Sequence, residues 1–333
     1  MTESPVRWGV LSTANIGRAA VIPAIHGARN STLVAVASRD GERARAFADA
    51  NTIPQAYGSY EALLAADDID AVYIPLPNSM HKEWVIKAAQ AGKHVLCEKP
   101  LALDADECMA MEAAANKAGV LLMEAFMYRF HPRTERVQAI VRSGLLGDVK
   151  LVRAAFTFRV TNPHNIRFQA DLGGGALMDV GCYCVNIGRT LADAEPVEAQ
   201  AFATWSASGV DEQLLGMLRF PNGMALQFDC ALTLARRETY EVVGTDGVLE
   251  VPAAFLPGTG DMTITINRGR HGTDVEQISG VDEYQLMVEH FADCILHNHA
   301  PRYTASEAAA NMRAIEALQR SARNNGRPEQ VEN

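Results

Sequence analysis

The sequence predicts an α/β protein with two domains: an N-terminal Rossmann domain and a C-terminal α+β domain with an open, mostly antiparallel sheet. Two observations support this. In the first third, short apolar β-rich runs alternate with amphipathic helical segments, which is typical of a parallel sheet with right-handed crossovers. After residue 126, several strand-like segments follow one another. We therefore place the dinucleotide-binding domain at residues 1–125 and a substrate-binding and oligomerisation domain at residues 126–333.

The first domain is predicted from its periodicity. Its strands are short apolar runs at Arg7–Leu11, Thr32–Ser38, Ala71–Ile74, His94–Cys97 and Val120–Glu124. Its helices are amphipathic segments at Ile16–Ala28, Gly41–Ala50, Ser59–Ala65, Met80–Gln90 and Asp104–Lys117.

The second domain begins with a predicted helix at Arg133–Arg142, and another helix follows Gly173-Gly-Gly175 as far as about Thr190. Its predicted strands are Leu151–Val160, Val197–Ser206, Gln213–Phe220, Met224–Ala235, Thr239–Val243 and Met262–Ile266. A hairpin turn is expected at Pro221-Asn-Gly223. The last helix should start near Thr304, which has capping-box spacing to Glu307, and should pack back on the Rossmann domain. The tail from Asn324 is expected to be disordered.

Composition limits the possible functions. A net charge of −10 leaves no electrostatic footprint for nucleic acid or an anionic membrane. The N-terminal residues have no basic region followed by an apolar run, and the most apolar stretch, Val120–Phe126, is short and contains Glu124. Six cysteines in a chain of 333 residues do not form a disulfide framework. We expect a cytoplasmic protein with reduced thiols, no nucleic-acid partner and no membrane partner.

The loop after the first strand is a candidate phosphate-binding loop. Against the pattern G-x-G-x-x-G, the glycine positions of Gly9-Val-Leu-Ser-Thr-Ala-Asn-Ile-Gly17 fall on Ser12, Ala14 and Gly17. Small residues still permit a tight turn and a close approach of a pyrophosphate to the helix N-terminus. The alternative is an ordinary βα turn. The expected contacts are Ser12, Thr13, Ala14, Asn15 and Ile16.

The end of the second strand favours NADP over NAD. An NAD-binding Rossmann fold places an acidic residue here for the ribose hydroxyls, whereas an NADP-binding fold has a basic residue nearby. Ser38 can donate to a 2′-phosphate, and Arg39 can pair with it. Asp40 has a competing role as N-cap of the next helix.

Lys99 is the first candidate for a catalytic group. In Gly92-Lys-His-Val-Leu-Cys-Glu-Lys-Pro100, a buried strand delivers Glu98 and Lys99 at its carboxyl end, where ligands bind in an open parallel sheet. Taken alone, a lysine at a strand exit is more often a surface residue, and the sequence on either side favours the catalytic role. The neighbouring strand exit, Ile74-Pro-Leu-Pro-Asn-Ser-Met-His81, is rigid because of its two prolines. There Asn78 could simply cap a helix and His81 could be a surface residue.

The segment Gly173–Tyr183 is the candidate site of the second domain. Its three glycines would let the backbone approach a ligand closely, and Asp179 and Tyr183 are four residues apart, so on a helix they share a face. Together they could orient and protonate an oxygen. A capped amphipathic helix with a half-buried Tyr183 is the alternative.

No metal is expected. Cys182 and Cys184 are too closely spaced for the usual zinc site, and no second pair lies near them. His290, Cys294 and His297 share one helical face, which also suits an amphipathic helix that buries Cys294.

Together these segments resemble the glucose–fructose oxidoreductase/inositol dehydrogenase/MocA family of NAD(P)-dependent oxidoreductases, over nearly the whole chain. The resemblance rests on the following stretches: 7–17, 74–81, 92–100, Glu124-Ala-Phe-Met-Tyr-Arg-Phe-His-Pro132 and 173–183. The form Asp179-x-Gly-x-Tyr183 is similar to the branch with dimeric dihydrodiol dehydrogenases, NADP-linked D-xylose dehydrogenases and glucose–fructose oxidoreductase. The resemblance also implies an open sheet that forms a homodimer or homotetramer interface.

The resemblance implies further roles. Lys99 would contact the reacting oxygen, Glu98 would lie close to the nicotinamide, and the cofactor crevice would be lined by Pro75, Leu76, Asn78 and His81. The expected pocket comprises Phe126, Tyr128, Arg129, His164 and Arg167, and Arg167 would also contact the cofactor.

The leading hypothesis is hydride transfer between NADP and a hydroxyl carbon of a sugar, polyol or cyclic diol. Tyr183 would move the proton, Lys99 would stabilise the alkoxide, and Asp179 would orient the substrate. Two alternatives remain open: a non-catalytic NADP-binding sensor, and an oxidoreductase that retains NADP tightly and acts between two sugars.

Overall fold

The structure is a computed structural model that describes residues 4–332. The chain divides into two compact units. Unit 1 runs to Phe130 and also contains Asp282–Ala309, and unit 2 contains His131–Val281 and the residues from Ala310 onward. The predicted boundary at residue 125 assigned residues 282–309 to the second domain. The structure groups them with the first, because helix α8 (Glu283–His297) packs against helix α1 (Ile22–Gly27) and strand β1 (Val6–Leu11).

Unit 1 contains a six-stranded sheet in the order β3-β2-β1-β4-β5-β6, and every neighbouring pair is parallel. Its other strands are β2 (Ser31–Ala37), β3 (Gln55–Tyr57), β4 (Ala71–Ile74), β5 (His94–Cys97) and β6 (Leu122–Glu124). The Rossmann fold is confirmed, and all five predicted strands lie within it. The short edge strand β3 was not predicted, because three half-buried residues give no period-2 signal.

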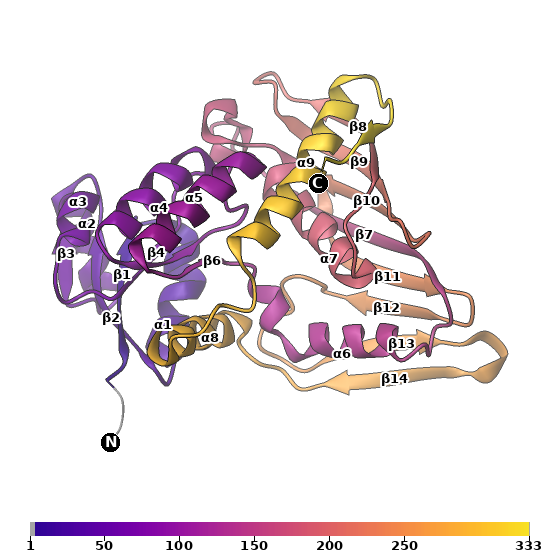
Figure 1. The fold of residues 1–333 in the computed structure, drawn as a ribbon, viewed down its shortest axis with the longest axis horizontal. Helices are drawn as coiled ribbons and strands as arrows, with labels where there is room; N and C mark the ends of the chain where they lie inside the picture. Colours follow the sequence, from indigo (N-terminus) through magenta and orange to yellow (C-terminus); the bar gives the residue numbers. More distant parts are fainter. Residues whose placement is uncertain (1–3, 333) are drawn as a thin grey trace. The chain divides into compact units, whose positions relative to one another are not determined.

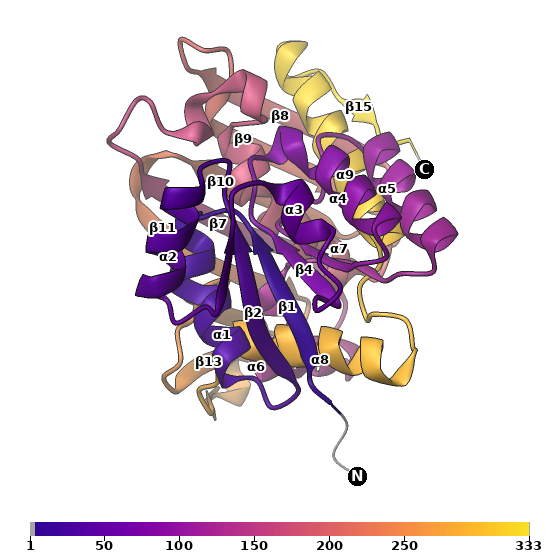
Figure 2. The ribbon, with the colours of Figure 1, turned by 90° about the vertical axis from the view of Figure 1, so that its left-hand side faces the viewer.

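Helices cover both faces of this sheet (Figure 2). Successive side chains of a strand point to opposite faces of the sheet. On one face of β1, the Trp8 ring packs against Phe291 of α8. On the other face, Leu63 lies so close to Gly9 that a side chain at this position would clash with it. The other helices of the unit are α2 (Gly41–Ala50), α3 (Tyr60–Leu64), α4 (His81–Gln90) and α5 (Ala105–Ala118). Short helices η1 (Gly17–Val21), η2 (Asn78–Met80) and η3 (Met127–Phe130) complete it.

Unit 2 contains a nine-stranded mixed sheet in the order β14-β13-β12-β11-β7-β10-β9-β8-β15. Among residues 4–332, the β7–β10 pair is the only parallel pair of this sheet, so the predicted mostly antiparallel sheet is confirmed. Its strands are β7 (Val149–Arg159), β8 (Glu198–Trp205), β9 (Asp211–Arg219), β10 (Ala225–Ala231), β11 (Thr233–Gly244), β12 (Val248–Pro252), β13 (Met262–Asn267), β14 (Thr273–Ile278) and β15 (Glu329–Gln330).

Three predictions about this sheet differ from the structure in detail. The predicted single strand Met224–Ala235 breaks at Leu232 and continues as β11, which also includes the predicted strand Thr239–Val243. The tail is not disordered throughout, because β15 pairs with β8. The expected hairpin between β9 and β10 is confirmed, with Gly223 at a positive φ of 82°.

The helices of unit 2 are α6 (Pro132–Arg142), α7 (Cys182–Ala192) and the greater part of α9 (Ala305–Arg323) (Figure 1). Helix α7 is buried almost all round and packs on β7 and β10. The predicted return of α9 to the Rossmann domain is limited to its first turn, where Ser306 bonds to Glu112 of α5. No helix within residues 4–332 is long and apolar enough to cross a membrane.

Candidate active site

The loop after β1 makes a tight turn at Ser12 and leads directly into a helix. Ser12, at the first glycine position of the pattern, adopts a φ of 139°, which normally favours glycine. Helical backbone begins at Asn15 and passes through a π-turn at Gly17–Val21. Ser12, Thr13 and Ala14 are half-buried, and Asn15 and Ile16 are exposed. The helix N-terminus beside this loop offers N–H groups suited to a pyrophosphate.

The three polar residues that follow β2 have different roles. Asp40 accepts from the backbone N–H groups of Glu42 and Arg43, which confirms it as the N-cap of α2. Ser38 is buried, and its hydroxyl accepts from the Asp40 N–H. Arg39 is exposed. The only exposed group with a positive charge among the three is therefore Arg39, as expected for a site that binds a 2′-phosphate.

Two residues near Arg39 escaped the sequence reasoning. Burial raises the pKa of the Tyr60 phenol, while Arg39 and Arg43 act in the opposite direction, so both guanidinium groups lie near this ring. The sequence did contain a signal for Arg43: it lies four residues after Arg39 at the start of a helix, a spacing that places two side chains on one face.

Three buried side chains hold the loop that contains Lys99. Tyr73 of β4 donates to the Glu98 carboxylate at 2.5 Å, Glu124 of β6 accepts from the Leu101 N–H at 2.7 Å, and His81 contacts the Pro100 carbonyl at 3.1 Å. Burial and the neighbouring Glu98 carboxylate raise the pKa of Tyr73, so its phenol remains a donor. Such fixation of a half-buried lysine is what a catalytic group requires.

His81 is a correction to the predicted crevice. Its side chain is fully buried, and its second ring nitrogen lies 2.9 Å from the Leu76 carbonyl. Burial lowers the pKa of this imidazole, which is therefore neutral at neutral pH. His81 therefore connects the loops that follow β4 and β5, and it does not line a surface. Pro75 and Leu76 are also buried. Asn78 is half-buried and begins η2.

Three predicted pocket residues are core residues. Phe126 and Tyr128 are almost fully buried, and their rings meet edge to face. Arg129 is buried, pairs with Glu307 at 2.7 Å and stacks on the Tyr303 ring at 3.5 Å. Their burial argues against direct substrate contact. The sequence could not reveal this because the partners of Arg129 lie more than 170 residues away.

The candidate groups of unit 2 lie on one continuous helical segment. Asp179 belongs to the π-turn η6 (Leu177–Gly181), and Tyr183 follows in the first turn of α7. Asp179 pairs with Arg167 at 2.5 Å. Arg167, predicted as a cofactor and pocket residue, therefore orients a carboxylate, while His164 is exposed in the preceding loop. Isolated π-turns occur frequently at functional sites.

Tyr183 stands in an aromatic cluster. Its ring lies 5.3 Å from the rings of both Phe156 and Phe255. The Phe255 loop is held by Arg133, which donates to the carbonyls of residues 252, 253 and 254, and by Glu238, which accepts from the N–H groups of residues 255 and 256. The position of the Tyr183 ring is thus set by packing on strands far away in sequence.

Contacts within the loop itself require glycine at two of the three positions, Gly174 and Gly175. A Cβ on Gly174 would lie 2.4 Å from the Arg167 carbonyl oxygen, and one on Gly175 would lie 2.3 Å from the Asp211 carboxylate. Gly173 and Gly175 also have positive φ, at 75° and 119°. The glycines therefore permit a tight packing of this loop on its own backbone and on β9.

The histidines of α8 have local partners. His290 accepts from the Arg302 N–H at 3.0 Å and contacts the Cys294 sulfur at 3.5 Å. Burial, with the nearby Arg302, lowers the pKa of His290 to about 4. Among the described residues, no group of three acidic, histidine or cysteine side chains is arranged to hold a metal ion.

Comparison with known proteins assigns the class. Residues 6–126 match the oxidoreductase family with an NAD-binding Rossmann fold, and residues 134–250 match the GFO/IDH/MocA C-terminal domain. The protein is an NAD(P)-dependent oxidoreductase that acts on CH–OH groups. It belongs to the glucose–fructose oxidoreductase/inositol dehydrogenase/MocA family.

Its relatives act on sugar-type molecules. The chain is 44% identical to D-xylose 1-dehydrogenase (NADP(+)) 2 of Haloferax volcanii, with 95% of this chain and 97% of the relative covered. A 3-ketoreductase from Actinomadura kijaniata, solved with NADP and TDP-benzene, is 31% identical with a TM-score of 0.90, over 96% of this chain and 98% of that one. An aldose-aldose oxidoreductase from Caulobacter crescentus, complexed with glycerol, is 28% identical with a TM-score of 0.90, over 98% and 100%.

Proposed function

We propose that this enzyme transfers a hydride between NADP and a hydroxyl or carbonyl carbon of a sugar, polyol or cyclic diol. The observation that carries the proposal is the buried scaffold of Tyr73, His81 and Glu124 around the Lys99 loop at the carboxyl edge of the Rossmann sheet. A surface lysine needs no such support. The similarity to an NADP-linked D-xylose dehydrogenase supports the substrate class.

The proposed mechanism assigns a role to each candidate residue. When bound, NADP supplies or accepts the hydride. Tyr183 gives the proton to the carbonyl oxygen during reduction and takes it from the hydroxyl during oxidation. The Lys99 ammonium stabilises the negative charge that develops on this oxygen. Asp179, held by Arg167, orients the substrate.

Incubation with NADP and a panel of pentoses, hexoses and diols, followed by the absorbance of the reduced nicotinamide, tests this function. Turnover of one of these classes supports it. No turnover in either direction, with NADP still bound, would favour a non-catalytic sensor.

One second candidate has a specific observation in its favour. The similarity to an aldose-aldose oxidoreductase supports an enzyme that keeps NADP bound and acts between two sugars. This candidate predicts that NADP co-purifies with the protein, and one absorbance spectrum of the pure protein tests it.

Arg39 is expected to set the cofactor preference. We propose that Ser38 and Arg39 hold the 2′-phosphate of NADP, while the loop of Ser12, Thr13, Ala14, Asn15 and Ile16 binds the pyrophosphate. Because a charge-assisted hydrogen bond contributes roughly 1.5–3 kcal/mol, Arg39→Ala should reduce the preference for NADP about ten- to a hundred-fold in kcat/KM. Arg45→Ala, an exposed arginine of α2, is the matched control. Equal use of NADP and NAD by the unmodified enzyme would contradict the assignment.

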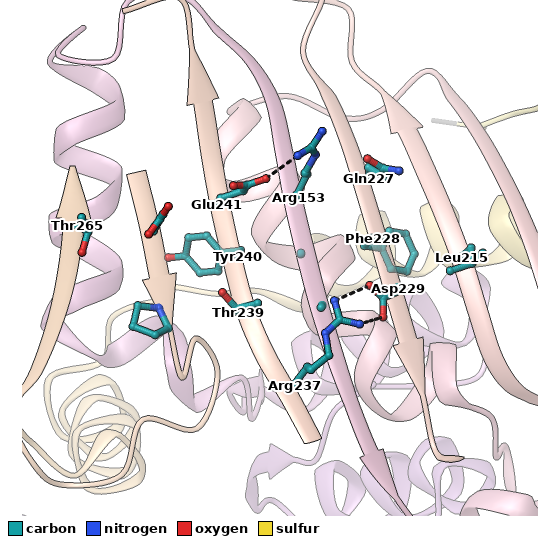
Figure 3. Close-up of a pocket in the computed structure, with 14 residues that line it drawn as sticks. Arg153, Leu215, Gln227, Phe228, Asp229, Arg237, Thr239, Tyr240, Glu241 and Thr265 are labelled. Carbon is teal, nitrogen blue, oxygen red and sulfur yellow. Dashed lines mark hydrogen bonds and ion pairs between the residues drawn. The ribbon is translucent and has the colours of Figure 1, made fainter. Parts of the chain in front are cut away.

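We also propose that the enzyme is a homodimer or homotetramer whose interface is the uncovered face of the unit 2 sheet. This face contains a concavity of about 570 Å³. Figure 3 shows Arg153 paired with Glu241 and Arg237 paired with Asp229 within it, beside Leu215. Exposed apolar side chains extend across the same sheet at Phe202, Leu215, Met217 and Val275. Exposed apolar side chains that gather on one face are typical of a surface that another subunit covers.

Substitution of an exposed apolar residue on this face should break the assembly. Leu215 is 52% exposed, and Leu215→Arg is expected to shift the particle to a monomer in light scattering, because a buried unpaired charge is costly. Met109→Arg, on the exposed face of α5, is the control and should leave the assembly intact. A monomeric wild-type protein at micromolar concentration would be evidence against this interface. The proposed location is the cytoplasm, since the six cysteines, all within the described residues, are buried and form no disulfide.

A further inference from the structure

The helix that carries Asp179 and Tyr183 begins without a capping side chain of its own. Its first hydrogen bond runs from the Asp179 N–H to the Gly175 carbonyl at 3.0 Å, which makes Gly175 the N-cap. Glycine has no side chain that could accept from the N–H groups of the first turn. Because residues 175–178 are buried, water does not readily replace such an acceptor.

Asp211 of β9 supplies this acceptor. Its carboxylate accepts from the Leu177 N–H at 2.7 Å, and the residue is only 5% exposed. The other carboxylate oxygen occupies the space of the missing side chain, since a Cβ on Gly175 would lie 2.3 Å from it. One residue normally provides both parts of an N-cap. Here Gly175 provides the backbone carbonyl, and Asp211, 36 positions later, provides the side-chain acceptor.

We propose that Asp211 is a positioning residue for the reaction: its carboxylate fixes the first turn of this helix and thereby the direction of Asp179 and Tyr183. The proposal rests on the proposed function. The physical reason is that the π-turn Leu177–Gly181 lies between the cap and Tyr183, and π-turns are rare and need support from their surroundings. A carboxylate at the helix N-terminus also interacts favourably with the helix dipole.

The environment of Asp211 is electrostatically unusual. Burial raises the pKa of its carboxyl to about 7, although the Leu177 N–H and Arg323 of α9 act in the opposite direction. Burial raises the pKa of the Cys230 thiol of β10, and the negative charge of the Asp211 carboxylate contributes to this rise. The pKa of this carboxyl is higher in the folded than in the unfolded state. The free energy of unfolding therefore falls as the pH rises from the pKa of the unfolded state to about 7. Asp211→Asn keeps an acceptor and removes this titration.

Two measurements on purified full-length protein test the proposal. Asp211→Ala should accelerate amide hydrogen exchange of the peptide over residues 174–183 by about ten-fold or more, and should lower kcat by a similar factor. The KM for NADP should stay within about two-fold, because the lesion lies in unit 2. Asp211→Asn should retain kcat within about three-fold. The Tm of this variant minus the Tm of the wild type should increase from about pH 5 to about pH 8, because only the wild type loses stability as Asp211 ionises.

Asp104→Ala is the matched control. Asp104 caps α5 by accepting from the Glu107 N–H at the same distance of 2.7 Å, but that helix carries no candidate site residue. It should lower Tm without lowering kcat. If Asp211→Ala does not fold, Asp211→Ser replaces it, because a serine hydroxyl is too short to reach the Leu177 N–H.

The outcomes separate this inference from the proposed function. Unchanged exchange in residues 174–183, or a kcat of Asp211→Ala within about two-fold of wild type, would overturn the positioning role. If the wild-type enzyme turns over no substrate, the proposed function fails, and the exchange measurement alone decides whether Asp211 is the cap.

Discussion

Tyr183→Phe is expected to lower kcat by about a hundred- to ten-thousand-fold, the range that general acid–base catalysis typically supplies. The substitution removes only the hydroxyl. The ring retains its packing against Phe156 and Phe255, so the melting temperature should stay close to that of the wild type. Measuring kcat and Tm on the same preparation distinguishes the loss of a proton donor from the loss of a packed side chain.

Tyr240→Phe provides the control within the same aromatic cluster. Tyr240 is buried, and its ring lies 6.1 Å from that of Phe255, but we assign it no part in the reaction. Its substitution should leave kcat near the wild-type value. If Tyr183→Phe kept more than about a third of kcat while hydride transfer limits the rate, Tyr183 would not be the proton donor.

Lys99→Ala is expected to lower kcat by about a hundred- to a thousand-fold, comparable to the removal of one donor that stabilises a developing oxyanion. The affinity for NADP should remain within a few-fold, because the proposed target of the ammonium is the reacting oxygen and not a phosphate. Single-turnover kinetics together with NADP titration would measure the two effects separately.

Lys93→Ala is the contrasting variant. Lys93 precedes the same strand, is buried, and donates to the carbonyls of Ala66 and Ile69, so it stabilises the fold. Its removal should lower Tm with near-normal kcat in the protein that remains folded. A similar pattern for Lys99→Ala would show that Lys99 has a structural role and would remove it from the mechanism.

Local patterns predicted most of the first unit. Apolar runs such as Ala71–Ile74 and His94–Cys97 are strands with those bounds, because a strand buried on both faces is apolar throughout. Asp40 and Thr304 were recognisable as caps, since capping depends on residues within one turn. The prediction was less accurate in the second unit, where the break at Leu232 divides an apolar run that has no turn residue.

The burial of several site candidates could not be predicted, because polar side chains can be either exposed or buried with partners. His81 and Arg129 seemed accessible, yet both are buried, and their partners come from other segments. Asp211 was overlooked because nothing near it in sequence marks it as the cap of a helix that begins at residue 176.

The sequence by itself determined the fold class and the family. It also supplied Arg39 as the reason to expect NADP, and Lys99, Asp179 and Tyr183 as candidate site residues. These depend on periodicity and short motifs, which are properties of neighbouring residues. Only the tertiary structure decided that Tyr73, His81 and Glu124 hold the Lys99 loop and that Asp211 caps the helix of Tyr183. The physical reason is that a buried polar group must find a partner, and the chain brings that partner from a distant segment only when the sheets and helices pack.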